Sequence, residues 1–173
     1  MATLARAVRA LVAGARVLSV LALAGLVVVL LLAIAVRELG ALGGTITWAE
    51  EAERFLFIWL VFLAGPVALD RGEHILISVL SRLLPGRVAL ACAALVRLLV
   101  LGFLGVMVYA GVDLVARTGN QFAAALGIPM SVVHAVLPAS AALMALQVAL
   151  LLAGDCRSLA RGEDRPVLWR TGA

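Results

Sequence analysis

Long apolar blocks separated by short polar stretches dominate this chain and predict helices that cross a membrane. Four blocks have the length that a bilayer requires, about 20 apolar residues in a helix. They cover residues 17–36, about 48–69, about 88–112 and about 129–152. Because the stretches between them are short, we expect one membrane domain over residues 17–153. A basic tail at 1–16 and a charged tail at 154–173 would flank it.

Arginine sets the expected orientation of these helices, because short loops rich in basic residues stay in the cytoplasm. From the N-terminal tail to the C-terminal tail, the five polar segments hold 3, 2, 3, 1 and 4 arginines, when Arg54 near the start of the second block is counted with the first loop. Both termini and the middle loop are therefore expected in the cytoplasm. The first and third loops are expected on the outer side of the membrane.

The middle loop contains a further amphipathic segment over residues 75–84. Its polar side chains fall within a narrow arc of a helical wheel, and they are Ser78, Ser81 and Arg82. This pattern is typical of a short helix in the membrane interface, and a solvated helical turn without a special role is the alternative. The expected fold class is an all-α integral membrane protein with four transmembrane helices and a short cytoplasmic interfacial amphipathic helix.

The amino-acid composition predicts that part of the protein surface faces lipid. Of the 173 residues, 65% are hydrophobic and 14% are charged, and the mean hydropathy is +1.16. A soluble domain of this size cannot bury so much apolar surface. The net charge of +4 comes from arginines that flank apolar blocks, so membrane lipids and no nucleic acid are the expected partners. Cys92 and Cys156 form no CxxC motif and predict neither a disulfide nor a metal site.

The start of the second block joins a charged cluster directly to an aromatic run. Thr47 and Glu50 have the spacing of a capping box, in which each side chain bonds the backbone N–H of the other residue. Glu50 also stands four residues before Arg54, which is a favourable spacing for an ion pair on a helix. Trp48 and Trp59 fall on the opposite, aromatic face.

Glu51 lies between these two faces and has no obvious partner in the chain. A charge close to the hydrocarbon layer is costly unless it is paired. We therefore expect that Glu51 or Arg54 contacts another subunit.

Arg97 stands inside the third block, between Val96 and Leu98. A long side chain there either reaches the headgroups at an extended cytoplasmic end of the helix or pairs with another helix or subunit. Both interpretations stay open at the level of sequence.

The sequence contains few residues that indicate catalysis or the binding of a cofactor or metal. His74 lies in the middle loop and His134 in the fourth block, so the two are not placed to ligate one haem. No zinc motif, P-loop or serine–histidine–aspartate spacing occurs. No span contains an acid at its centre, where ion-coupled transport usually needs one. No cofactor, metal or enzymatic activity is expected, and the chain is better suited to assist transport than to perform it alone.

Three blocks of sequence resemble the small membrane subunit of tripartite ATP-independent periplasmic (TRAP) transporters. The first is Trp48-x-Glu50-Glu51-x-x-Arg54-Phe55-Leu56-Phe57-Ile58-Trp59. The second is Arg71-Gly72-x-His74-Ile75, and the third is Leu126-Gly127-Ile128-Pro129-Met130 followed by Pro138. The resemblance covers about residues 17–153, with the blocks in the order of the family. This sequence departs from the family pattern at Ser78, often Asp there, at His134, often aromatic, and at Glu53, an additional acid.

The resemblance implies a multi-pass protein of the bacterial inner membrane. It would be the non-catalytic small permease subunit of a sodium-driven, binding-protein-dependent transporter for organic acids. The implied partners are a large multi-span permease subunit, which the chain would brace, and a periplasmic substrate-binding protein, which it would help to dock. The residues implied at the subunit interface or scaffold are Trp48, Glu50, Glu51, Arg54, Trp59, Arg71, His74, Arg97, Gly127 and Pro129.

Three alternatives share parts of this pattern. The small subunit of tripartite tricarboxylate transporters also has four spans, but it lacks the tryptophan and glutamate block. A membrane redox or enzyme subunit would carry a coloured cofactor. A freestanding exporter would transport by itself.

Overall fold

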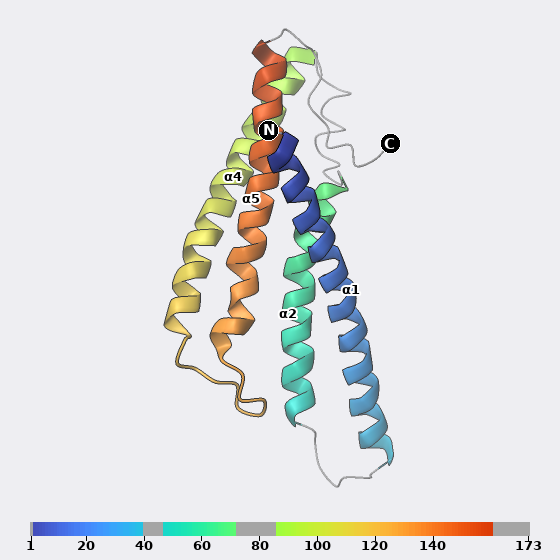
Figure 1. Ribbon diagram of the computed structural model, residues 1–173. Coiled ribbons are helices and arrows are strands. Elements are labelled where there is room, and N and C mark those ends of the chain that lie inside the picture. Colours follow the sequence, from blue (N-terminus) through green and yellow to red (C-terminus); the bar gives the residue numbers. More distant parts are fainter. Residues whose placement is uncertain (1, 40–46, 72–85, 161–173) are drawn as a thin grey trace.

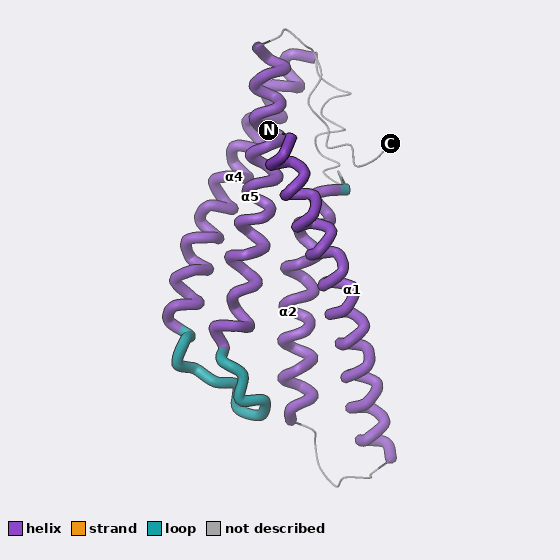
Figure 2. The backbone as a smooth tube through the Cα atoms, viewed as in Figure 1, coloured by secondary structure: helices purple, strands orange, loops and turns teal. Residues whose placement is uncertain are grey.

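The structure, a computed structural model, describes residues 2–39, 47–71 and 86–160. They form four helices: α1 (Ala2–Leu39), α2 (Thr47–Asp70), α4 (Gly86–Arg117) and α5 (Met130–Ala160) (Figure 1). All four are long and apolar enough to cross a membrane. Helices make up almost all of the described backbone, with one ordered loop between α4 and α5 (Figure 2). The predicted all-α class with four spanning helices is confirmed. The interfacial helix expected at 75–84 lies outside the described residues.

The helices extend beyond the apolar blocks that predicted them. Residues 2–16, expected as a tail, form the first turns of α1, which has 38 residues and is therefore about 57 Å long. This segment is rich in alanine, leucine and arginine, which are strong helix formers. At the other end of the chain, α5 continues to Ala160, past the expected limit at residue 152.

Two antiparallel hairpins build the bundle. α1 packs along α2 and α4 packs along α5, and contacts between α2 and α5 join the two hairpins (Figure 1). Among the described helices, α4 contacts α5 alone. We call the end where α1 and α4 begin, and where α2 and α5 finish, the N-terminal end of the bundle. The ordered loop between α4 and α5 lies at the opposite end.

α5 is the central helix. Of its most apolar 18 residues, 33% are buried, compared with 11% for α1 and 17% for both α2 and α4. One apolar cluster joins α5 to α1 and α2, and its buried members are Val8, Val12, Ala15 and Val67. A second cluster joins α5 to α2 and α4, and its buried members are Leu69, Leu104, Ala141 and Val148. α5 therefore holds the two hairpins together.

A glycine allows α4 to approach α5 closely in the half of the bundle nearer to the α4–α5 loop. Gly111 is buried, and a Cβ atom at this position would lie 2.5 Å from Leu137 Cδ2 and 3.0 Å from Pro138 Cδ. Pro138 lies inside α5, where its ring takes the place of a backbone N–H. The missing Cβ at position 111 makes room for that ring.

Candidate functional site

Glu51 anchors the loop between α4 and α5. Its Oε2 atom accepts hydrogen bonds from the backbone N–H groups of Ala125 and Leu126, each 3.0 Å long. The expectation that Glu51 has no partner in the chain is therefore wrong. The partners are backbone amides about 75 residues away, which no pattern of side chains marks in the sequence. Whether Glu51 also faces another subunit stays a prediction.

The anchored loop is closed by its own backbone. Gly127 N–H donates to Ala123 O at 2.9 Å, and Ala123 N–H donates to Ile128 O at 2.9 Å. Gly127 has a φ of +65°, a left-handed conformation that glycine adopts without strain. Pro129 pairs with Phe122 in an isolated β-bridge. Gly127 and Pro129, both predicted site residues, thus give the loop its shape.

Thr118 and His134 connect the two helices on either side of this loop. Thr118 Oγ1 donates to Leu114 O at 2.8 Å and lies 3.2 Å from His134 Nδ1. Thr118 is buried and His134 is half-buried. His134, which the sequence did not favour as a haem ligand, therefore makes a polar contact at the start of α5.

Arg97 pairs with Asp155 across the α4–α5 contact. Its Nη1 atom donates to Asp155 Oδ2, and it lies 3.4 Å from Leu151 O. The two side chains are 6% and 0% exposed. Of the interpretations left open for Arg97, the structure shows the pair between helices. Asp155 was not predicted as a partner, because it falls just beyond the expected end of the fourth span.

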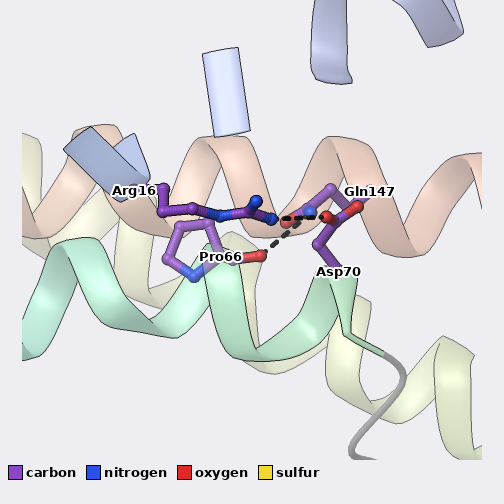
Figure 3. A network of polar contacts seen from close by, with 4 residues as sticks. All are labelled: Arg16, Pro66, Asp70 and Gln147. Carbon is purple, nitrogen blue, oxygen red and sulfur yellow. Dashed lines mark hydrogen bonds and ion pairs between the residues drawn. The ribbon is translucent and has the colours of Figure 1, made fainter. Parts of the chain in front are cut away.

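A second polar group lies at the same end of the bundle (Figure 3). Arg16 Nη2 of α1 lies 3.5 Å from Asp70 Oδ2 at the end of α2. Next to them, Gln147 Nε2 of α5 donates to Pro66 O of α2 at 3.1 Å. Asp70 and Gln147 are buried, while the Arg16 side chain is 47% exposed. These polar contacts join α1, α2 and α5 beside the apolar cluster that the same three helices share.

The remaining predicted residues occupy the first turns of α2 and the turn after it. Trp48 is 40% exposed, Glu50 and Arg54 are exposed and Trp59 is half-buried. α2 begins at Thr47, where the capping box predicted a helix start, although the reciprocal capping bonds stay a prediction.

Two other predictions in this region have different outcomes. None of the ion pairs within the described helices joins Glu50 to Arg54. The pairing expected between these two residues is therefore not formed here. Arg71 is exposed directly after α2. His74 lies outside the described residues.

Comparison with known proteins identifies the family. The model of the family described as "Tripartite ATP-independent periplasmic transporters, DctQ component" matches residues 26–158. The chain belongs to this family. A relative from Oleidesulfovibrio alaskensis, named isethionate TRAP transporter permease protein DctMQ, is 33% identical over 112 residues. The matched part is 64% of this chain and 18% of the relative, so the chain spans about a fifth of that protein's length.

Membership of the DctQ family decides the broad class. The chain is a component of a transporter and not an enzyme, and its four spanning helices make it a multi-pass protein of the inner membrane. The match includes Glu51, its loop, Arg97 and Asp155. The expected orientation, with both termini in the cytoplasm, stays a prediction.

Proposed function

We propose that this chain is the small permease subunit of a sodium-driven TRAP transporter for organic acids. It would brace a large multi-span permease subunit in the membrane and help a periplasmic substrate-binding protein to dock. The observation that carries this proposal is the DctQ family match over residues 26–158. The named relative, a permease for isethionate, supports an organic acid as the substrate class and extends far beyond the matched segment, as expected if a large permease is joined to it.

The use of polar side chains within the bundle supports an accessory role. The acids buried in the described helices, Asp70 and Asp155, lie at the N-terminal end, and each contacts an arginine. Coupled ion transport usually needs acids or unwound helices near the bilayer midplane. Polar contacts in this chain instead fasten one helix to another, as a scaffold requires.

The outward face of α4 is our candidate for contact with the large subunit. Tyr109 is 80% exposed and lies about 12 Å from the end of the helix at Arg117. A hydroxyl group at such depth is costly in lipid unless another protein group bonds it. Gly102 and Gly105 on the same helix are exposed and have open space around them, which allows a second helix to approach closely.

α1 offers a contrast that favours lipid as its neighbour. Its exposed large side chains between Val17 and Ile34 are all valine, leucine or isoleucine. Such a surface can contact lipid tails at no cost, because it contains no polar group that would need a hydrogen bond. We therefore place the large subunit against α4 and lipid against the outer part of α1.

Copurification from native membranes tests the proposal. Tagged full-length chain should recover a large multi-span permease, and the pair with its binding protein should accumulate an organic acid in proteoliposomes when sodium is supplied outside. The small subunit alone should be inert. Recovery of a homo-oligomer without a permease, or transport by the chain alone, would contradict the proposal.

Tyr109 tests the assigned face. Tyr109→Leu should reduce recovery of the large permease several-fold, because the replacement keeps an apolar side chain but removes the hydroxyl. Val28→Ala, on the exposed surface of α1, should leave the recovery unchanged. Equal effects of the two substitutions would overturn the placement on α4 without affecting the family.

A further inference from the structure

We propose that Glu51 is a positioning residue that holds the α4–α5 loop in the shape on which the periplasmic binding protein docks. This inference rests on the proposed function and deepens it, because it names the surface and the residue that maintains it. The partner is a soluble protein that meets the end of the bundle opposite the N-terminus.

The loop needs a hydrogen-bond acceptor that its own side chains do not supply. Residues between Ala123 and Gly127 form a single helical turn, closed by the bond from Gly127 N–H to Ala123 O. The first N–H groups of such a turn have no acceptor within it. Usually Ser, Thr, Asp or Asn at the start of the turn accepts them. Here that position is Ala123, followed by Ala124 and Ala125, and none of the three carries a polar side chain.

Glu51 of α2 supplies the missing cap from another part of the chain. One carboxylate oxygen bonds two successive amides, those of Ala125 and Leu126, at 3.0 Å each. A negative charge at the start of a helical turn is also favoured by the dipoles of its peptide groups, and hydrogen bonds to a charged acceptor are stronger than neutral ones. The loop is thereby fixed to α2 as well as to α4 and α5, and it is held in one place relative to both hairpins.

The location of the loop favours a soluble partner over a membrane helix. It lies at the end of the bundle rather than along its side (Figure 1). Its exposed residues include polar Asn120 and Gln121 and the small residues Ala124 and Ala125. Phe122, 64% exposed, adds an apolar anchor of the kind that interface centres contain. A polar, ordered end surface with one aromatic side chain suits protein–protein contact in water.

Hydrogen exchange and binding measured on the same variants test the inference. Glu51→Ala and Glu51→Gln would be made in the complex with the large permease in nanodiscs. The control is Glu38→Ala, which removes one acid from the last turn of α1, where Glu38 is exposed and lies 3.5 Å from Arg37. Amide exchange would be followed in peptides that cover residues 119–130.

Glu51→Ala should speed exchange at the Ala125 and Leu126 amides about tenfold, because the charged acceptor is lost. Glu51→Gln should restore part of the protection, because its carbonyl oxygen still accepts. Affinity for the binding protein should fall most in Glu51→Ala and less in Glu51→Gln. Recovery of the large permease should be unchanged in both variants. Glu38→Ala should change none of these.

Each contrary outcome identifies a different error. Unchanged exchange in Glu51→Ala would show that the hydrogen bonds from Ala125 and Leu126 to Glu51 do not form. Faster exchange with an unchanged affinity for the binding protein would show that the α4–α5 loop is not the docking surface. Loss of the large permease from the purified Glu51→Ala complex would assign the loop to that subunit instead. If wild-type protein recovers no permease and binds no binding protein, the proposed function itself fails.

Discussion

Arg97 of α4 and Asp155 of α5 form an ion pair from which solvent is almost excluded, with side chains 6% and 0% exposed. Arg16 of α1 and Asp70 of α2 repeat the arrangement in the other hairpin, at 3.5 Å. In each hairpin an arginine in the first helix meets an aspartate near the end of the second. Both hairpins are therefore fastened at the N-terminal end of the bundle, while Glu51 fastens α2 to a loop at the opposite end.

Removing Asp155 should strongly destabilise the subunit. Asp155→Ala leaves the buried Arg97 charge without its carboxylate, which costs about 3–5 kcal/mol in comparable sites. The measurement is the free energy of unfolding in detergent micelles.

The exposed pair of Arg117 and Asp113 provides the control for this prediction. Its atoms lie 2.8 Å apart, but the side chains are 77% and 50% exposed, so Asp113→Ala should cost less than about 1 kcal/mol. Equal losses for Asp155→Ala and Asp113→Ala would contradict a special role for the buried pair. The double variant Arg97→Met with Asp155→Leu should recover most of the stability, because neither position then buries a charge between α4 and α5.

Adding one methyl group at Gly111 should weaken the contact between α4 and α5. The new Cβ would lie 2.5 Å from Leu137 Cδ2 and 3.1 Å from Pro138 Cβ, so the Leu137 side chain must leave its place and the rigid ring of Pro138 must shift slightly. We expect Gly111→Ala to cost about 1–3 kcal/mol, measured by thermal unfolding of the isolated subunit.

Gly102 gives the matched comparison, because it has open space around it. Gly102→Ala should stabilise the isolated subunit by about 0.5–1 kcal/mol, since alanine is the better helix former. The same substitution should reduce recovery of the large permease if α4 is the interface. Opposite signs for the two glycines in the isolated subunit are the decisive result, and a loss at both positions would refute this account of α4.

Gln147 should contribute to the junction between α2 and α5. Its side chain is 1% exposed, and its Nε2 atom bonds Pro66 O at 3.1 Å. Gln147→Met keeps the approximate volume but removes the donor, and we expect a loss of about 1 kcal/mol in unfolding free energy. Met144→Leu, a swap of similar volume beside Gly65, should cost less, because it removes no hydrogen bond. An unchanged stability in Gln147→Met would show that the bond is energetically neutral.

Arg16 should stabilise the end of α2. Asp70 is 4% exposed and is the last residue of its helix, where the helix dipole disfavours an anion. Arg16→Gln should therefore lower the unfolding free energy by about 1 kcal/mol. Arg9→Gln removes the same charge from an exposed position of α1 and should change it by less than about 0.5 kcal/mol. Equal effects would attribute the loss to net charge rather than to the contact with Asp70.

The amino-acid sequence by itself determined that four segments become membrane-spanning helices and that lipid surrounds them. Apolar blocks of bilayer length can satisfy their backbone groups in lipid only as helices, so the four spans follow from local pattern alone. The start of α2 at Thr47 was equally visible, because a helix cap is a local feature. For Arg97 the sequence left two interpretations open, a side chain that reaches the headgroups and a pair with another helix or subunit. The three blocks of family resemblance also pointed to the DctQ component.

The tertiary structure decided which groups meet. Arg97 finds Asp155, and Glu51 finds the amides of Ala125 and Leu126. Those partners depend on how far one helix slides along another, and a shift by one turn, about 5.4 Å, would separate every pair. Periodicity within a helix carries no information about that register. Backbone amides, identical at every position, leave no mark in the sequence, so the anchor of the α4–α5 loop became apparent only when the helices were packed together.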